Sequence, residues 1–524
     1  MRTLLFVFFL CALANPAGHA FAIDKAAVEK LAFGEADERS EAIAALLAEG
    51  DPRAAALLEA VSGGDMQTAG KRVLIVKGEQ GTDAVTGEPV TPLPEGREDV
   101  VANNRLRREI EGALAAFKLL SPQRATRLEA AKALAGGADA SMLALVKKAL
   151  EKESDPDIRP LLELTASSME MKSGDKETRL AAIRRLGESN SSNSRTLLAE
   201  AVTDADADIR IAAQKSLLEV QGKLAWGERA GLLFAGVSLG SILLLAALGL
   251  AITYGLMGVI NMAHGELIMI GAYTTYVVQV LFRKTNFFDW YLLIAVPASF
   301  IVAAAVGMVL ERVVIRWLYG RPLETLLATW GISLMLIQSV RTLFGAANVQ
   351  VENPAFMSGG IQAFAGVVLP WSRIVIVAFA IAVLISIWLL LTRTRLGLFV
   401  RGVTQNREMA SCVGVPTGLV DMWAFGLGSG IAGLAGCALS QIGNVGPDLG
   451  QGYIVDSFMV VVFGGVGQLA GTVYAALTLG FANKFLEAVS GAVIAKIVVL
   501  VFIIIFIQRR PQGLFAVKGR ALEA

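Results

Sequence analysis

The chain has 524 residues, of which 54% are hydrophobic and 18% are charged, and its formal net charge is +1. This composition is too apolar for one water-soluble domain and too charged for a chain made only of membrane helices. Two parts of different character are therefore expected.

The charged residues divide the chain near Trp226. Of 47 Lys and Arg and 46 Asp and Glu, 18 and 12 fall in residues 226–524, which leaves 29 and 34 in the first 225 residues. We predict a mildly acidic, water-exposed domain over 23–225 and a polytopic α-helical membrane domain over 226–515, followed by a short tail at 516–524. The predicted fold class is all-α.

Residues 1–22 have the pattern of a signal peptide. Arg2 precedes an apolar run at 4–13, and small residues follow at 18–22, where a peptidase could cleave. The domain at 23–225 is then exported. The alternative is an uncleaved anchor helix, for which the apolar run is short.

Cysteine and histidine are rare in the predicted mature chain. Cys11 and His19 lie in the predicted signal, so that only Cys412, Cys437 and His264 remain. We expect no disulfide framework, no metal site and no bound cofactor.

The exported domain shows a pattern of paired amphipathic helices. Ala and Leu recur at helical spacing with Arg or Asp at the turns in 177–220, in 124–168 and, as a fragment, in 40–61. The pattern resembles a HEAT-like solenoid with a period of about 40 residues, and an alternating segment at 72–96 predicts an inserted hairpin. Such a domain could bind a ligand or be a passive structural domain.

Seven membrane spans are predicted in the second part. Apolar segments near the ~20 residues needed to cross a bilayer lie at about 230–252, 262–282, 290–315, 323–344, 372–392, 419–441 and 493–508. Arginines cluster after the third and fifth segments, which places these ends and the C-terminus in the cytoplasm. The region 453–486 is interrupted by glycines at 464, 465 and 467, and we expect a re-entrant or half-helix pair there.

The segment 254–267 places polar residues within an apolar region. Burying such groups costs several kcal/mol unless partners or water meet them, so a functional role is the first hypothesis. The residues could line a permeation path or could hold neighbouring helices together. No nucleophile motif and no second histidine accompany them, so we expect no catalytic residues. The candidate path residues are Tyr254, Gly258, Asn261, His264 and Glu266.

The segment 393–417 is predicted to be a cytoplasmic loop that carries a short helix. A basic run precedes the pattern Glu-x-Ala-x-x-x-Gly, which predicts a helix with a glycine stop. Such a helix suits insertion into a groove of a soluble partner, and a solvated loop is the alternative. The candidate partner-contact residues are Arg401, Arg407, Glu408, Ala410 and Gly414.

These two segments carry a resemblance to a known family. The sequence Gly-Leu-Met-Gly-Val-Ile-Asn-Met-Ala-His-Gly-Glu at 255–266 and the pattern at 408–414 resemble the permeases of the branched-chain amino acid ABC importers, over about 230–515. The added signal and exported helical domain are similar to the first permease subunit of the urea branch. The resemblance implies a urea permease, with branched-chain amino acids as the alternative substrates.

The resemblance also implies partners and a location. They are a second permease subunit, two cytoplasmic ATPase subunits, an exported substrate-binding protein and the lipid of a bacterial inner membrane, with no nucleic acid. The sequence contains no Gly-x4-Gly-Lys-[Ser/Thr] phosphate loop, which fits a transporter subunit that is not itself an ATPase. A passive urea or water channel is another hypothesis, although it would not need the segment at 408–414.

Overall fold

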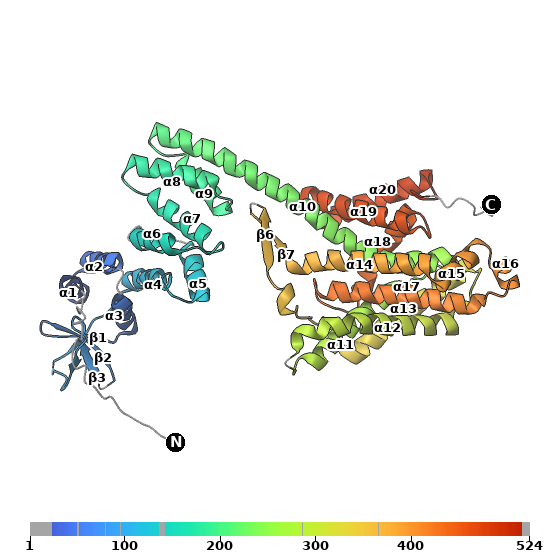
Figure 1. The fold of residues 1–524 in the computed structure, drawn as a ribbon, viewed down its shortest axis with the longest axis horizontal. Coiled ribbons are helices and arrows are strands. Elements are labelled where there is room, and N and C mark those ends of the chain that lie inside the picture. Colours follow the sequence, from blue (N-terminus) through green and yellow to red (C-terminus); the bar gives the residue numbers. More distant parts are fainter. Residues whose placement is uncertain are drawn as a thin grey trace, which may run out of the picture. The chain divides into compact units, whose positions relative to one another are not determined.

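The computed structural model describes residues 24–49, 52–78, 80–94, 96–135, 142–285, 287–364 and 366–515 (Figure 1). The predicted signal peptide and the predicted tail at 516–524 lie outside the described residues. The chain forms two compact units, Met1–Lys223 and Leu224–Ala524.

The N-terminal unit is mainly helical. Its core contains leucine and isoleucine side chains that are almost completely buried, among them Leu31, Leu46, Leu57 and Ile110. This burial of apolar surface is the main stabilising contribution to the unit. The helices are α1 (Lys25–Phe33), α2 (Ala36–Glu49), α3 (Pro52–Gly63), α4 (Asn104–Lys118), α5 (Arg124–Ala135), α6 (Leu143–Lys152), α7 (Arg159–Glu170), α8 (Lys176–Glu188) and α9 (Ser192–Ala201).

A five-stranded antiparallel sheet lies between α3 and α4 in the chain. Its strands are β1 (Met66–Ala69), β2 (Arg72–Lys77), β3 (Gln80–Asp83), β4 (Pro89–Val90) and β5 (Glu98–Asp99), in the order β4-β3-β2-β1-β5. The prediction of a single hairpin at 72–96 was therefore wrong in extent. The outer strands β4 and β5 have two residues each and no buried face, so no alternating pattern marks them in the sequence.

Two stretches of the N-terminal unit repeat the same ion pairs. Arg127 of α5 pairs with Glu153, and Arg179 of α8 pairs with Asp204 at the corresponding place. Asp155 and Asp206 accept further charged hydrogen bonds, from Arg124 and Lys176. The matching residues are about 51 positions apart, so this spacing is longer than the predicted period of about 40.

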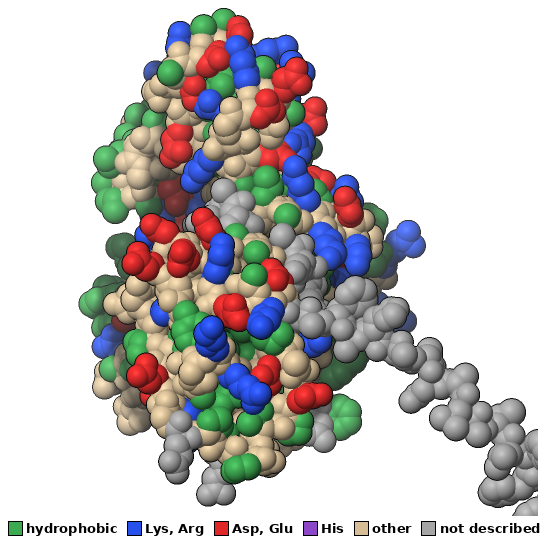
Figure 2. All heavy atoms as spheres, turned by 90° about the vertical axis from the view of Figure 1, so that its left-hand side faces the viewer, with side chains coloured by type: hydrophobic (Ala, Val, Ile, Leu, Met, Phe, Trp, Pro, Cys, Tyr) green, Lys and Arg blue, Asp and Glu red, His purple; other side chains and the backbone are tan. Residues whose placement is uncertain are grey.

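The surface of the N-terminal unit carries charges of both signs. Figure 2 shows Lys and Arg side chains interspersed with Asp and Glu over the face that it presents, together with scattered apolar side chains. Such mixed charge is typical of a surface exposed to water.

The second unit contains the membrane helices. Among the residues that the structure describes, seven helices are long and apolar enough to cross a membrane, in agreement with the seven predicted spans. The elements are residues 224–257 of α10 (Ala207–Met257), then α11 (His264–Phe282), α12 (Tyr291–Val313), α13 (Pro322–Phe344), α14 (Trp371–Arg393), α15 (Arg395–Gln405), α16 (Arg407–Cys412), α17 (Thr417–Ser440), α18 (Leu449–Gly464), α19 (Leu469–Ser490) and α20 (Ala492–Arg509), with strands β6 (Gly360–Phe364) and β7 (Val367–Pro370).

Two boundaries differ from the sequence-based expectation. The end of the amphipathic pattern predicted over 177–220 and the span expected from about 230 are parts of one continuous helix, α10 (Ala207–Met257). The segment 393–417 holds two helices, α15 and α16, rather than one. The predicted glycine break is present, because α18 ends at Gly464 and α19 begins at Leu469.

Close backbone approach at glycines holds the centre of the membrane unit together. A Cβ atom on Gly436 of α17 would overlap the carbonyl oxygen of Ile268 in α11, and one on Gly271 would overlap the carbonyl oxygen of Gly433. Helices α11, α12 and α17 can therefore pack at short distance only because these positions lack side chains.

We expect Gly436→Ala to destabilise the membrane unit by about 1–3 kcal/mol, because the added methyl group must push α11 and α17 apart. Thermal unfolding of the purified chain in detergent measures the effect. The matched control is Gly331→Ala in α13, where an added Cβ meets no atom within 4 Å. Equal melting temperatures for the two variants would contradict this account.

Acid should weaken the N-terminal unit through its ion pairs. The hydrogen bond from Arg124 holds the pKa of Asp155 below its usual value, and that from Lys176 does the same for Asp206. A carboxylate whose folded-state pKa is lowered stabilises the fold above its unfolded pKa of about 3.9, and this contribution is lost as the pH falls through the lower, folded value.

We therefore expect amide exchange in α5–α9, corrected for intrinsic rates, to accelerate between about pH 5 and pH 3. At about pH 5 the amides of the double variant Asp155→Asn/Asp206→Asn should be less protected from exchange than those of the unmodified chain. Their protection should also change less between about pH 5 and pH 3. Glu129→Gln on the exposed side of α5 is the control. If the double variant keeps the full pH response, these pairs are not its source.

Candidate functional site

A break in the helical backbone lies inside the membrane unit. Helix α10 ends at Met257, α11 begins at His264, and the residues between them are not helical. Gly258 has φ +64°, a left-handed conformation that favours glycine, so its role is to turn the chain. Val259 and Asn261 are nevertheless buried. Irregular backbone at this depth requires polar partners from the protein or from a water-filled cavity.

Side chains from the break and from α13 supply part of these partners. The Asn261 Oδ1 atom accepts a hydrogen bond from the amide of Ala263 at 3.0 Å. The Thr329 hydroxyl of α13 accepts one from the amide of Met262 at 3.2 Å and donates to the carbonyl of Thr325 at 2.8 Å. Thr329 therefore links the non-helical segment to α13 by a hydrogen bond.

His264 is completely buried at the first position of α11. Its Nε2 atom lies 2.9 Å from the carbonyl oxygen of Ala246 in α10. A carbonyl oxygen only accepts, so Nε2 carries the proton and donates it in this bond. The other ring nitrogen, Nδ1, has no hydrogen-bond partner among the described residues, and it can accept a hydrogen bond from a bound molecule.

Glu266 is 1% exposed in the first turn of α11. Its Oε1 atom accepts a hydrogen bond from the Ser333 hydroxyl of α13 at 2.7 Å, whereas Oε2 has no partner in the described part of the chain. Asp448, which directly precedes α18, forms an ion pair with Arg341 of α13 at 2.7 Å.

Three predicted path residues share one property. The Nδ2 atom of Asn261, the Nδ1 atom of His264 and the Oε2 atom of Glu266 are all buried and all lack a partner among the described residues. Native proteins contain few such atoms, and each calls for an explanation such as bound water or an ion. One short segment thus carries both donor and acceptor atoms that are buried without a partner among the described residues.

The other two predicted path residues have different roles. Tyr254 is half-buried, with its ring edge-on to Phe458 at 6.5 Å between centroids. Gly258 turns the backbone, as described above. Sequence reasoning missed Thr329 and Ser333, since hydroxyl residues in a predicted span carry no signal of the helix that they bind.

The first turns of two helices meet beside the site. A Cβ atom on Gly265 of α11 would overlap the carbonyl oxygen of Gly450 in α18, and the reverse holds for Gly450. The amino ends of α11 and α18 thus lie together, and each carries partial positive charge from its unpaired N–H groups. This positive potential lies close to the Glu266 carboxyl.

The second candidate segment forms two short helices. The Asn406 side chain caps α16 by accepting a hydrogen bond from the amide of Met409 at 2.9 Å, and Gly414 with φ +88° follows the helix. Arg401 of α15 donates to the carbonyl oxygen of Leu391 in α14. Glu408 is exposed, whereas Ala410 is buried. Helix α16 therefore presents an acidic side chain to its surroundings and packs its other face on the unit.

Arg407 has an internal role that the sequence did not indicate. Its guanidinium donates two hydrogen bonds to the carboxylate of Asp421 in α17, whose side chain is completely buried. The presence of an acidic residue in a predicted span was the available signal for Asp421. Arg407 is therefore a structural link between α16 and α17 rather than a free surface charge.

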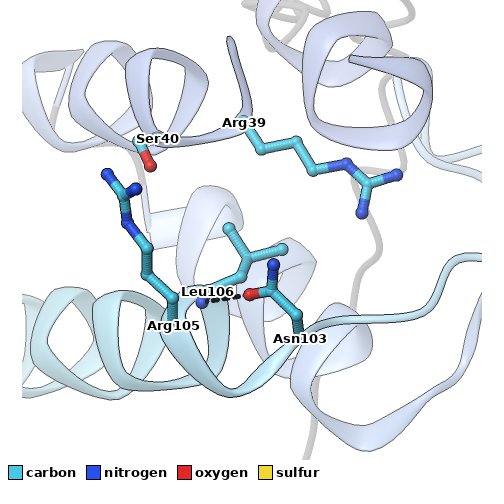
Figure 3. A pocket seen from close by; sticks show the side chains of 5 residues that line it. All are labelled: Arg39, Ser40, Asn103, Arg105 and Leu106. Carbon is cyan, nitrogen blue, oxygen red and sulfur yellow. Dashed lines mark hydrogen bonds between the residues drawn. The ribbon is translucent and has the colours of Figure 1, made fainter. Parts of the chain in front are cut away.

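A small cavity of about 70 Å³ in the N-terminal unit is not a comparable site (Figure 3). The amide group of Asn103 caps α4 by accepting a hydrogen bond from the amide of Leu106 at 2.8 Å. Arg39 donates to the backbone carbonyl of Gly34, and Arg105 pairs with Glu109. The polar groups that line the cavity are thus engaged in holding the fold.

Comparisons with known proteins identify the membrane unit. Residues 232–507 match the family model described as branched-chain amino acid transport system / permease component. The permease protein BraD of Pseudomonas aeruginosa is 29% identical over 287 residues, which cover 53% of this chain and 93% of BraD. LivH of Escherichia coli K12 is 27% identical and covers 54% of this chain and 94% of LivH.

A sugar permease is a more distant relative. The ribose import permease protein RbsC of Escherichia coli K12 is 28% identical over 207 residues, which are 37% of this chain and 61% of RbsC. No solved structure matches the chain. Because the family model covers more than half of the chain, the chain belongs to the family of permease components of branched-chain amino acid transport systems.

Proposed function

We propose that this chain forms the translocation path for urea in an ATP-driven importer. The observation that carries the proposal is the set of buried, unpartnered polar atoms on Asn261, His264 and Glu266 at a helix break. Broken helices at membrane depth are a common way to build a substrate site in transporters. Urea offers four N–H donors and one carbonyl acceptor, which suit an imidazole nitrogen, a carboxyl oxygen and an amide N–H.

The charges of the site support a substrate without a carboxylate group. No lysine or arginine is among the buried residues of the described chain, so a substrate carboxylate would find no fully buried cationic side chain in the described part. The curated relatives BraD and LivH are covered almost entirely by about half of this chain. This chain therefore adds a large N-terminal unit to a common core, which supports a function distinct from theirs.

Branched-chain amino acids are the second candidate substrates. BraD and LivH carry that substrate in their names, and the adjoining amino ends of α11 and α18 would favour a carboxylate. The amino acids carry a carboxylate and an ammonium group, whereas urea carries neither. Measuring the uptake of each substrate directly distinguishes the two candidates.

The energy for uptake comes from separate subunits in this proposal. A neutral solute gains nothing from the membrane potential, and a thousandfold accumulation costs about 4 kcal/mol. Two cytoplasmic ATPase subunits supply this energy through the α15–α16 region, with Glu408 at the contact. A second permease subunit completes the path, and an exported binding protein delivers the substrate to this bacterial inner-membrane complex, on the side where residues 24–225 lie.

We expect cells that carry this chain and its partner subunits to take up labelled urea from micromolar solution, and cells without the chain to lose this uptake. Uptake of labelled leucine should not depend on the chain. If cells without the chain lose leucine uptake but keep urea uptake, the substrates are branched-chain amino acids. If they keep both, the proposed function is overturned.

A pair of serine variants connects this uptake to the site. Ser333→Ala removes the hydroxyl that binds Glu266, and about tenfold weaker urea uptake is expected for a lost hydrogen bond to a carboxyl group. Ser339→Ala is the matched control in the same helix, because that hydroxyl is exposed and binds only the carbonyl of Met335. Equal urea uptake by the two variants would contradict the proposal that Glu266 lies on the translocation path.

We expect Glu408→Lys to abolish ATP-driven uptake while the complex still assembles, since the change reverses a charge on the exposed face of α16. Uptake and copurification of the ATPase subunits measure the two effects. Glu324→Lys, an exposed residue in the first turn of α13, is the control. Coupled uptake at the normal rate in Glu408→Lys would exclude Glu408 from the ATPase contact.

A further inference from the structure

A series of direct contacts begins at α16. The Arg407 guanidinium, which is bonded to the buried carboxylate of Asp421, also lies over the ring of Tyr319, with its Cζ atom 5.1 Å from the ring centroid. This is the geometry of a cation–π contact. Tyr319 lies between α12 and α13, so one arginine of α16 contacts two separate parts of the membrane unit.

The same tyrosine contacts the residue that precedes the helix break. The Tyr319 hydroxyl donates to Glu311 Oε1 at 2.8 Å and lies 3.3 Å from the sulfur atom of Met257. Met257 is the last residue of α10, and the non-helical segment begins at Gly258. Two side-chain contacts therefore connect α16 with the start of the break.

Apolar packing connects the same two places. Ala410 of α16 belongs to a buried cluster with Leu256, Val420 and Ala424, against which Met257 packs. The polar side and the apolar side of α16 therefore both reach the carboxyl end of α10. Close-packed interiors transmit strain, so we expect a displacement of α16 to act on the end of α10.

The carboxyl group of Glu311, which accepts the hydrogen bond from Tyr319, has one oxygen atom without a hydrogen-bond partner among the described residues. The Oε2 atom of Glu311 is buried and has no hydrogen-bond partner in the described part of the chain. Burying an unpaired carboxyl oxygen is unfavourable. A second state in which Tyr319 and Glu311 form different hydrogen bonds can therefore replace this one. Coupling between two sites requires an element with two such states.

We propose that Tyr319 is a positioning residue that couples movement of α16 to the break at 258–263, and so to Asn261, His264 and Glu266. The inference rests on the proposed function, because it requires that ATPase subunits displace α16. It adds a route: Arg407 to Tyr319 to Met257. Tyr319 is not expected to touch the substrate.

The test places a reporter in the break. Met262→Cys in a Cys412→Ser background is labelled with a small maleimide in the complete importer in lipid nanodiscs, without nucleotide and after trapping with ADP and vanadate. Trapping should change the labelling rate by about fivefold or more, the lower end of typical coupling between sites. In Tyr319→Phe, which keeps the ring but loses the hydroxyl, this change should disappear.

The matched control is Tyr474→Phe, the same chemical change on an exposed tyrosine of α19. Copurification of the ATPase subunits and basal ATP hydrolysis should stay normal in both variants, which a merely structural role for Tyr319 would not predict. If Tyr319→Phe does not assemble, the same loss of response in Glu311→Gln decides the question.

The outcomes separate the two proposals. If the unmodified complex shows no ATP-dependent uptake, the proposed function fails and the coupling route fails with it. If the complex transports but trapping leaves labelling at residue 262 unchanged, or changes it equally in Tyr319→Phe, the proposed function stands and the route through Tyr319 is overturned.

Discussion

The membrane unit depends on one constraint, which is that backbone N–H and C=O groups in hydrocarbon must find partners within the protein. Continuous helices meet this constraint by themselves, but the interruptions at 258–263 and after α18 do not. At 258–263 the side chains of Asn261 and Thr329 bind backbone amides. At the end of α18, the amides of Leu514 and Phe515 donate to the carbonyls of Phe463 and Gly464. Each interruption is therefore covered by residues distant in the sequence.

Covering these interruptions requires unusually close packing, which explains the use of glycine. The backbones of α11 and α18 touch at Gly265 and Gly450, and those of α11 and α17 touch at Gly271 and Gly433. The same approach encloses the unpartnered atoms of His264 and Glu266. The polar site and the glycine contacts are thus two consequences of one arrangement, since a looser bundle would leave these polar atoms facing lipid.

The sequence predicts what depends on local pattern and misses what depends on distant contacts. Apolar length located the seven spans, and buried polar residues drew attention to Asn261, His264 and Glu266. Ser333 and Asp421 were missed as partners, because nothing local tells which side chain they meet. The two-residue strands β4 and β5 were missed because they have no buried face, and the repeat spacing became visible only through matching ion pairs.

The proposed import of urea, which is a neutral molecule, would make the link between α16 and the break necessary. The membrane potential does no work on such a molecule, so all energy for its accumulation must reach the site as movement of the protein. The site begins directly after α10, and the end of α10 is in contact with both Tyr319 and the cluster around Ala410. The contacts from α16 to the start of the Asn261 segment are therefore short, and they pass through Tyr319 and Met257 or through the cluster around Ala410.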